Sequence, residues 1–432
     1  MQQYEKYKDS GVDWIGEIPE HWKMLSNKYI FKLKKNQVGK KSADYELLSL
    51  TLKGIIKRDM ENPEGKFPAE FDTYQEVKKG DFIFCLFDVE ETPRTVGLSD
   101  FDGMITGAYT VFTASEETDR KYLYYFYLNL DEKKRLKFLY RGLRNTIPKD
   151  SFFTFKTTFP PIEEQQTIAT FLDAKTAKID QRIANRQKEI ELLKERRQIL
   201  IQKAVTTGLD DTAPLKDSGV DWIGEIPEHW EVRKLKYHIN IQGGFAFDSA
   251  DFKDEGVQII KIANTYMNQL SLDRQPTFVD SSYLDSHRDW VVSKNDILMS
   301  LTGTLGKRDY GFAILIEDDS KFLLNQRVAK ITIQEGIEVN YLLILLQSDS
   351  YLGQLYSLPA GTKQANLSND NVINIKMPIP SLEEQMTIVE YIKQIKEKIH
   401  KAILLKQQEI EKLKEYKTVL IDNVVTGKVK IN

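Results

Sequence analysis

The sequence has a single cysteine, and no apolar run approaches the roughly 18 residues that a membrane span requires. One cysteine excludes any disulfide within the chain. Cys85 lies inside the apolar segment at residues 81–87, which predicts a buried strand thiol rather than a nucleophile or a metal ligand. No apolar stretch at the start resembles a signal peptide. We therefore expect a soluble cytoplasmic protein without a membrane partner.

The chain also lacks an excess of charge of either sign. It carries 61 Lys and Arg against 64 Asp and Glu, a formal net charge of −3. A strongly basic balance would by itself indicate a nucleic-acid partner, and this sequence does not have one. Any DNA-binding surface must therefore be local.

Sequence motifs for catalysis and cofactor binding are missing as well. Leu301 stands where a phosphate-binding loop would need its first glycine before residues 306–307, and no Gly-x-Gly-x-x-Gly fingerprint occurs. The tetrapeptide FPPI at residues 159–162 lacks the polar and aromatic ends of an adenine-methyltransferase motif. The Glu-x-Lys at residues 64–66 is of a kind that recurs by chance in a charged chain. We predict no catalytic site.

What the chain does contain is an internal repeat. The segment KDSGVDWIGEIPEHW occurs at residues 8–22 and returns without a change at residues 216–230. The segment PPIEEQQTI at residues 160–168 returns as PSLEEQMTI at residues 380–388. Each copy therefore consists of a head motif, a body and a long polar-apolar segment.

The two bodies, residues 23–158 and 231–378, share almost no sequence. A repeated frame around diverged bodies is expected where each body recognises something different while being held in the same way. Both bodies mix short apolar runs with helical patterns, which predicts a mixed α/β (α+β) fold. The repeat divides the chain into target-binding domain 1 at 1–159, a long helix at 160–209, target-binding domain 2 at 210–379 and a second long helix at 380–432.

Two long helices are the clearest structural prediction. No Gly or Pro occurs between Glu163 and Thr206, and Gly208 follows directly. Apolar residues form a heptad seam in the first helix at Leu172, Ile179, Ile183, Ile190, Leu193, Leu200 and Ala204. The matching seam of the second helix contains Ile392, Ile399, Ile403, Ile410, Leu413, Leu420 and Val424. Polar residues interrupt both seams at the same levels, namely Thr176, Arg186 and Arg197 against Lys396, Lys406 and Lys417.

A helix with one apolar stripe must bury that stripe, and the only stripe of equal length is its twin. The first helix leads to body two and the second must return, so we expect an antiparallel coiled coil with an internal pseudo-two-fold axis. A helix of about 44 residues is roughly 65 Å long, or at most about two turns of DNA. Two unlike bodies on such a spacer would suit a split DNA site with a gap of fixed length.

The chain resembles the DNA-specificity subunits of Type I restriction-modification systems over its whole length. The resemblance lies in the repeated head motif, the two helix starts, and the closing AVT at 204–206 and VVTG at 424–427. Body two also resembles the family in SLTGTLGK at 300–307 and PAGTKQANL at 359–367. Body one departs from it, with LFDVEETPR at 86–94 after the corresponding strand.

This resemblance implies a non-catalytic subunit that binds double-stranded DNA at a bipartite site, with one target-recognition domain for each half. It also implies that the helices dock two adenine-methyltransferase subunits and, through them, two restriction-translocase subunits. S-adenosylmethionine, ATP and Mg²⁺ are then expected on those partners, with no cofactor on this chain. The expected location is the cytoplasm of a bacterium or an archaeon.

Candidate DNA-contacting residues are loop side chains that can hydrogen-bond to base edges or neutralise phosphates. In body two these are Thr302, Thr304, Lys307, Arg308, Asn325, Gln326, Arg327, Lys363, Gln364 and Asn366. In body one they are Lys57, Arg58, Arg94, Arg141, Arg144 and Asn145. For each of them the alternative is a solvated loop residue with no ligand.

The repeated heads contain His21 and His229 in identical settings between Glu and Trp. Two histidines without cysteines or suitably spaced carboxylates make a weak metal or catalytic site, so we predict packing roles and no metal. We expect the neighbouring tryptophans to anchor each head on the helix pair, namely Trp14, Trp22, Trp222 and Trp230.

Two other functions remain open at this point. A coiled-coil scaffold with protein-binding or glycan-binding heads predicts no DNA affinity at low salt. An enzyme with its own nuclease or methylase site predicts S-adenosylmethionine binding or DNA cleavage by the isolated chain. Neither explains why the frame is repeated while the bodies differ.

Overall fold

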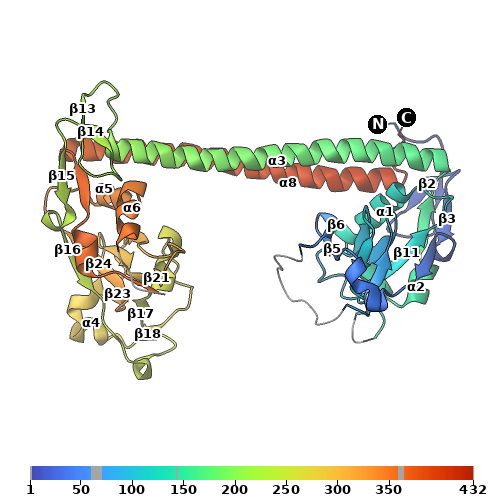
Figure 1. Ribbon diagram of the computed structural model, residues 1–432, viewed down its shortest axis with the longest axis horizontal. Helices are drawn as coiled ribbons and strands as arrows, with labels where there is room; N and C mark the ends of the chain where they lie inside the picture. Colours follow the sequence, from blue (N-terminus) through green and yellow to red (C-terminus); the bar gives the residue numbers. More distant parts are fainter. Residues whose placement is uncertain (1, 60–70, 143–144, 359–363, 432) are drawn as a thin grey trace. The chain divides into compact units, whose positions relative to one another are not determined.

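The sequence repeat is also a structural repeat (Figure 1). The computed structural model describes residues 2–59, 71–142, 145–358 and 364–431. They form two units of mixed helix and strand. Unit 1 comprises Met1–Lys188 and Lys406–Asn432, and unit 2 comprises Glu189–Leu405.

Unit 1 is built on a four-stranded antiparallel sheet with the strand order β4-β11-β8-β9. The central strand β8 is buried at every position, so its run of Phe-Ile-Phe is apolar on both faces. Cys85 directly follows β8 and is buried, as predicted. The strands and helices of the body are β1 (Tyr7–Asp9), β2 (Glu17–Pro19), β3 (Lys23–Ser26), β4 (Phe31–Lys34), β5 (Leu48–Thr51), β6 (Gly54–Lys57), β7 (Gln75–Val77), β8 (Phe82–Phe84), β9 (Val96–Leu98), β10 (Gly103–Ile105), β11 (Thr110–Ala114), α1 (Arg120–Glu132), α2 (Lys149–Thr154) and β12 (Lys156–Phe159).

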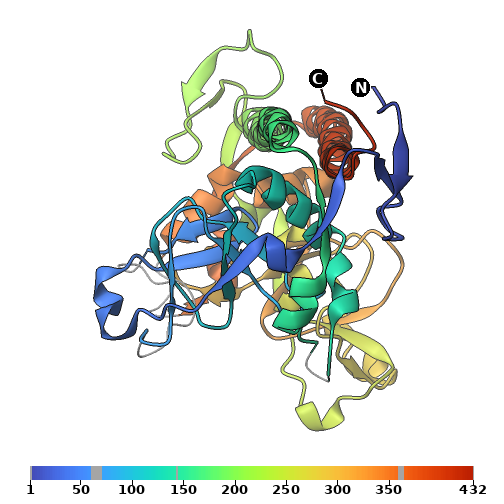
Figure 2. The same ribbon diagram turned by 90° about the vertical axis from the view of Figure 1, so that its right-hand side faces the viewer.

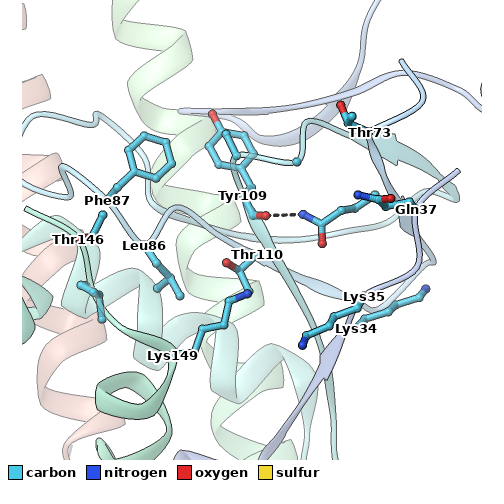
Figure 3. Close-up of a pocket in the computed structure, with 14 residues that line it drawn as sticks. Lys34, Lys35, Gln37, Thr73, Leu86, Phe87, Tyr109, Thr110, Thr146 and Lys149 are labelled. Atoms are coloured by element: carbon cyan, nitrogen blue, oxygen red, sulfur yellow. Dashed lines mark hydrogen bonds between the residues drawn. The ribbon is translucent and has the colours of Figure 1, made fainter. Parts of the chain in front are cut away.

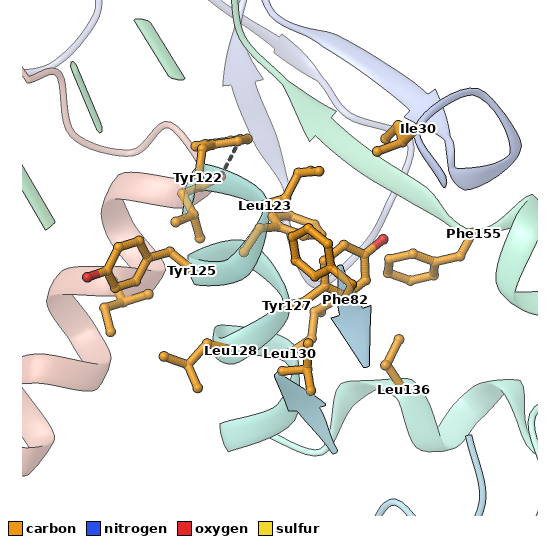
Figure 4. Close-up of a cluster of buried hydrophobic side chains, with 14 of the residues drawn as sticks. Ile30, Phe82, Tyr122, Leu123, Tyr125, Tyr127, Leu128, Leu130, Leu136 and Phe155 are labelled. Atoms are coloured by element: carbon orange, nitrogen blue, oxygen red, sulfur yellow. Dashed lines mark hydrogen bonds between the residues drawn. The ribbon is translucent and has the colours of Figure 1, made fainter. Parts of the chain in front are cut away.

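Helix α1 joins this sheet to the long helices. Its first turn is capped by Asp119, whose carboxylate accepts the Tyr122 N–H at 2.8 Å. Figure 4 shows Tyr127 beside Phe82 and Phe155 on one side of α1 and Tyr125 on the other. The ring of Tyr127 is fully buried, and its hydroxyl donates to the Asn27 side chain at 2.7 Å. The aromatic core of unit 1 is thus continuous from the sheet through α1.

Unit 2 repeats this sheet as β16-β24-β20-β22. In both sheets the first strand along the chain pairs with the last, and the last pairs with the second, so the diverged bodies share one topology. Unit 2 has a second four-stranded sheet, β18-β17-β23-β19, in which β17 and β23 run parallel, whereas the further sheets of unit 1, such as β10-β7 and β5-β6, have two strands each. The elements are β13 (Leu215–Asp217), β14 (Glu225–Pro227), β15 (Glu231–Lys234), β16 (Ile239–Gly243), β17 (Val257–Ile260), η6 (Ile262–Asn268), β18 (Phe278–Val279), α4 (Tyr283–Ser286), β19 (Val291–Val292), β20 (Ile297–Ser300), β21 (Thr302–Thr304), β22 (Ala313–Leu315), β23 (Phe322–Leu324), β24 (Val328–Ile333), α5 (Val339–Leu346), α6 (Asp349–Ser357), β25 (Gln364–Asn366), α7 (Asn369–Ile373) and β26 (Lys376–Ile379).

The two predicted long helices are α3 (Ile162–Thr206) and α8 (Leu382–Val425). In unit 1 the early part of α3 packs against the late part of α8, as the ion pairs Asp180–Lys417 at 2.7 Å and Arg186–Glu409 at 2.6 Å show. Figure 2 shows these ends of α3 and α8 side by side. In unit 2 the late part of α3 shares a core with the early part of α8, where Ala204 and Ile392 are both buried. Within each unit the two helices therefore run antiparallel.

The polar interruptions of the seam make different contacts in the two units, although they stand at matched levels. In unit 1 the Thr176 hydroxyl lies 3.1 Å from the Tyr125 hydroxyl. At the matched level of unit 2, burial lowers the pKa of Lys396, and the neighbouring charge of Arg197 lowers it further. The seam is thus polar at the same level in both units, with paired hydroxyl groups in unit 1 and two like charges in unit 2.

The repeated Glu-Glu-Gln motif at each helix start holds head, body and helix together. In unit 1 the fully buried Gln165 accepts the N–H of Asp119, the cap of α1, at 2.9 Å and donates to the Pro160 carbonyl at 2.9 Å. In unit 2 Gln385 accepts the N–H of Glu338, the cap of α5, at 2.8 Å. Each glutamine therefore fixes the body helix to the start of the long helix.

Replacing Gln165 by Ala should lower the free energy of unfolding by about 1–3 kcal/mol, because it leaves a buried N–H and a buried carbonyl without partners. Gln385→Ala should have an effect of the same size. Denaturant titration of the full chain measures both. Gln166, the exposed neighbour on α3, is the matched control, and an equal loss in Gln166→Ala would contradict this role.

In each unit the head segment contacts the start of one long helix and the end of the other. His21 Nε2 lies 2.8 Å from Glu164 Oε2, and His229 Nε2 lies 2.7 Å from Glu384 Oε1. The histidine side chains are about half exposed, so each one links its head to the start of a long helix by a polar contact at the surface. Each long helix is followed by a glycine with positive φ, Gly208 at 74° and Gly427 at 76°, against which a buried tryptophan ring packs. The tryptophans are Trp230 and Trp22, respectively.

The other two head tryptophans lie elsewhere. Trp14 packs beside Phe126 at 6.1 Å, with the Arg135 guanidinium 4.3 Å from its ring. Trp222 is 52% exposed and packs against Gly353 of α6, so the prediction that it anchors its head on the helix pair is wrong. The identical heads differ here because their surroundings come from the diverged bodies.

Asp422, near the end of α8 in unit 1, is a carboxylate surrounded by positively charged side chains and hydrogen-bond donors. Lys133 and Arg135 contact its carboxylate at 2.9 and 3.2 Å, and Asn129 donates to it at 2.9 Å. Burial alone would raise the pKa of Asp422, but these donors and Lys428 outweigh it and lower the pKa to about 2. The ionised form of Asp422 therefore stabilises the folded unit.

The stability difference between the native chain and Asp422→Asn should depend on pH. A carboxylate with a lowered pKa contributes stability above its ordinary value of 3.8 and loses it as the pH falls towards about 2. The deficit of Asp422→Asn should therefore be full at pH 7 and should shrink below pH 4. Urea titrations at several pH values measure this, and a deficit that stays constant down to pH 2.5 would refute it.

Candidate functional site

The segment that follows the central strand, β8 in unit 1 and β20 in unit 2, is anchored by an equivalent backbone hydrogen bond in both bodies. In unit 1 the Ile147 N–H donates to the Leu86 carbonyl at 2.7 Å, and in unit 2 the Leu367 N–H donates to the Leu301 carbonyl at 2.8 Å. Leu86 and Leu301 are therefore equivalent positions. The segments after them, which differ in sequence, help to line the candidate site of each unit.

In unit 2 this segment forms a two-stranded ribbon of β21 and β25. Thr302 lies opposite Asn366, and Thr304 lies opposite Gln364. The ribbon thus brings together four residues that the sequence singled out from two separate motifs. Lys363, the fifth, lies outside the described residues.

Thr302 differs from the other three candidates on the ribbon because it is buried, whereas Thr304, Gln364 and Asn366 are exposed. It is 8% exposed, and its hydroxyl oxygen has no hydrogen-bond partner in the described part of the chain. A buried hydroxyl without a partner costs free energy that a ligand could recover. This side chain lines a hollow beside the ribbon.

The hollow in unit 2 has a volume of about 540 Å³. Its walls come from η6, the following loop and the ribbon, and they include Tyr266, Arg274, Gln275, Thr302, Asp309 and Gln364. The Arg274 guanidinium lies 4.5 Å from the centre of the Tyr266 ring. A side chain on Gly303 would meet the Asp309 carboxylate, so glycine permits the close approach of residue 309 to the ribbon.

Tyr266, Arg274 and Gln275 were not among the residues predicted from the sequence. These residues lie in a connection between two strands, and nothing in their spacing marks a site. The signal that locates them is a tertiary contact, because the buried side chain of Asn264 accepts the Lys261 N–H and donates to the carbonyls of Ser271 and Arg274.

The other candidates of unit 2 surround the ribbon in two groups. Asn325, Gln326 and Arg327 form the turn before β24, and the Arg327 carbonyl accepts the Leu301 N–H at 3.0 Å. Lys307 lies in the turn after Thr304. Arg308 has a φ of 53° and points its guanidinium over the Tyr356 ring at 5.5 Å, in a separate groove beside Trp222.

Unit 1 has a hollow of about 530 Å³ beside the equivalent segment (Figure 3). Lys34, Lys35 and Lys149 line it together with glutamine and aromatic side chains. The rings of Phe87 and Tyr109 stack at 6.4 Å with an interplanar angle of 15°. The remaining polar walls include Gln37, Gln75, Thr73, Thr110 and Thr146.

The charge of the unit 1 hollow is positive. Lys34 is neutralised by Asp81 at 2.9 Å. Lys35 and Lys149 are exposed, and no carboxylate in the described ranges pairs with either of them. These lysines could not be predicted as site residues, because single lysines in loops occur all along a chain with this composition.

The sequence candidates of unit 1 are more scattered. Arg94 is 14% exposed at its side chain and pairs with the buried Asp131 at 3.1 Å, which makes it part of the core. Lys57, at the end of β6, forms an ion pair with Glu46 at 3.8 Å, and the half-buried Arg58 follows it. Arg141 and Asn145 are both exposed, and Arg141 pairs with Thr146, which directly precedes the Ile147 anchor. Arg144 lies outside the described residues.

The described residues contain no group of three or more His, Cys, Asp or Glu side chains that could hold a metal ion. Among the described helices, none is both long and apolar enough to cross a membrane. The candidate sites are two polar hollows, one beside each of the equivalent segments that follow Leu86 and Leu301. One is lined by lysines, and the other by an arginine, glutamines and a buried threonine.

Comparison with known proteins agrees with this arrangement. The family model for the Type I restriction modification DNA specificity domain matches residues 19–192 and 227–414. The chain is 31% identical over 286 residues to the Type I restriction enzyme MjaVIII specificity subunit of Methanocaldococcus jannaschii, an alignment that covers 66% of this chain and 64% of that relative. The chain thus spans less than two thirds of that relative's length.

Two solved structures share the fold. One comes from work on complex assembly and conformational transition of the type I R-M system, with a TM-score of 0.69 and 16% identity over 95% of this chain and 99% of that one. The other is the HsdS subunit from Thermoanaerobacter tengcongensis, with a TM-score of 0.55 and 16% identity over 95% of this chain and 98% of that one. At these identities the likeness concerns the fold.

Proposed function

Because the chain belongs to the family of Type I restriction-modification DNA specificity domains, we propose that it selects the DNA target of such a system by binding a split double-stranded site. Each unit binds one half of the site through the loops beside its central strand. The chain itself carries out no chemistry. It acts in the cytoplasm of a bacterium or an archaeon, where the host DNA lies.

One observation carries this proposal, namely that two units of the same topology present different side chains around the same anchored segment, which follows Leu86 in unit 1 and Leu301 in unit 2. Unit 1 offers Lys35 and Lys149 beside stacked aromatic rings. Unit 2 offers Arg274 and Gln364 beside the unpaired Thr302 hydroxyl. A protein that recognised the same ligand twice would keep these residues alike, whereas two different half-sites require them to differ.

The long helices supply the spacing in this proposal. Helix α3 has 45 residues, and a helix of this length spans about 67 Å, or roughly two turns of DNA. The antiparallel packing of α3 and α8 within each unit supports a paired coiled coil that holds the two reading sites a fixed distance apart. The gap between the half-sites would then be set by helix length and left unread.

The long helices would also bind the partner subunits. Leu192 and Ile199 on α3 are 52% and 58% exposed, and Val419 on α8 is 47% exposed, although all three are apolar. Apolar side chains exposed on helices are the kind of surface that a second protein covers. We infer that two methyltransferase subunits dock here and that two restriction subunits join through them. S-adenosylmethionine, ATP and Mg²⁺ would be bound by those partners.

Selection from a random pool of double-stranded DNA tests this function. The full chain, co-expressed with the methyltransferase subunit of its host, should enrich sequences with two short fixed blocks separated by a gap of constant length. Enrichment of a single contiguous block, or no enrichment at low salt, would contradict the proposal. The second outcome is the one that a protein-binding scaffold predicts.

A further inference from the structure

We propose that Arg274 recognises a guanine in the half-site bound by unit 2, with the Thr302 hydroxyl as a second contact in the same hollow. This inference rests on the proposed function and adds a specificity-determining residue to it. Arginine pairs with the two acceptors on the major-groove edge of guanine through its planar fork of N–H groups. The structure supplies three reasons to assign that role to Arg274.

The first reason is that the backbone of Arg274 is fixed. Asn264 is fully buried, and its amide nitrogen donates to the Arg274 carbonyl and to the Ser271 carbonyl, both at 2.8 Å. Its amide oxygen accepts the Lys261 N–H at 2.8 Å. One side chain thus closes the connection between η6 and β18. A loop held in this way presents Arg274 without the entropy cost of ordering it on binding.

The second reason is that the guanidinium is oriented and unpaired. It lies 4.5 Å from the centre of the Tyr266 ring, and Tyr266 is itself 39% exposed at the wall of the hollow. No carboxylate among the described residues forms an ion pair with Arg274. The fork of N–H donors is therefore held against an aromatic plane and remains available to a ligand.

The third reason is the charge of the hollow, which favours a base over a phosphate. Its lining contains the Asp309 carboxylate and no lysine in the described part of the chain. Asp309 would repel the full negative charge of a phosphate more strongly than the uncharged edge of a base. The unpartnered hydroxyl of Thr302 and the amide of Gln364 add the short-range donors and acceptors that base recognition needs. The hollow of unit 1, with Lys35 and Lys149, has the opposite character and suits the DNA backbone.

The test is selection from random double-stranded DNA by the full chain with its methyltransferase subunit, comparing the native protein with Arg274→Lys and Arg274→Ala. Both variants should lose preference for guanine at one position of one block by about 5- to 150-fold, while the other block and the gap stay the same. The lysine variant keeps the charge and loses the fork, so it separates base recognition from charge neutralisation. Tyr266→Leu should weaken the same preference, and Tyr266→Phe should retain it.

Arg288→Ala is the matched control, because this exposed arginine lies in the same unit and pairs with Asp285 outside the hollow. It should leave the selected sequence unchanged. If Arg274→Ala selects the same two blocks as the native chain, the assignment is wrong and the proposed function stands. A uniform loss of affinity for all sequences, with a lower salt dependence, would show a phosphate contact and also overturn it. If the native complex enriches no split site, the proposed function itself fails, and the assignment falls with it.

Discussion

Inserting one heptad into each long helix should lengthen the unread gap of the target by about three base pairs while both half-site sequences stay the same. Seven helical residues add about 10 Å, and DNA rises about 3.4 Å per base pair. A whole heptad keeps the seam in register. Suitable points lie between Ile183 and Ile190 in α3 and between Ile403 and Ile410 in α8. Selection from random DNA with the insertion variant measures the new gap.

The control is the same insertion in α3 alone, which leaves the two seams unequal in length. That variant should lose stability and select neither the old nor the new spacing. A matched insertion that leaves the gap unchanged would show that the helices do not set the distance between the half-sites, even if both units bind DNA.

Replacing Asp131 by Ala should lower the free energy of unfolding of unit 1 by about 3–5 kcal/mol. The Asp131 carboxylate is 1% exposed and accepts the hydroxyl and the N–H of Thr95 at 2.6 and 3.1 Å. It also pairs with Arg94 at 3.1 Å and with Lys134 at 2.9 Å. Its removal leaves a largely buried guanidinium without a counter-charge. Denaturant titration of the full chain measures the loss.

The pair of Glu90 and Lys137 in the same body provides the control for this variant. Both side chains are about half exposed, and the ion pair at 2.8 Å faces solvent. Glu90→Ala should therefore change stability very little, because water and salt screen such pairs. Equal losses in Asp131→Ala and Glu90→Ala would mean that burial does not decide the strength of the Asp131 network.

The long helices and the repeated heads were predictable because both follow regular patterns in the sequence. The heptad seam predicted a helix from Glu163 to about Thr206, and α3 runs from Ile162 to Thr206. Leu172 and Ile179, early members of the seam, are buried as expected. The unchanged head repeat likewise predicted one structure used twice. The seam can be read from the sequence because a helix brings residues on successive turns onto one face.

Interactions that join distant segments were not predictable. The role of Gln165 became visible only when the fold placed it against the cap of α1, far back in the sequence. Trp222 belongs to a repeat identical to that of Trp14, yet the two rings have different neighbours. Identical sequence predicts identical local structure, whereas its packing depends on elements that differ between the bodies.

The candidate site was predictable in part for the same reason. The two motifs of body two gave Thr302 and Gln364, which the ribbon brings into one hollow. Arg274 was missed because its position depends on the buried side chain of Asn264 rather than on any local pattern. In body one Arg94 was selected as a polar loop residue, and its buried pairing with Asp131 could not be read from the sequence.

The most direct test of the account is to exchange residues 231–378 for the corresponding body of another family member and to map the methylated sites in the host. If each unit reads its own half-site, the exchange replaces one block of the target, and the block read by unit 1 and the gap remain. If both blocks change together, or if neither changes, the division of the target between the two units is contradicted.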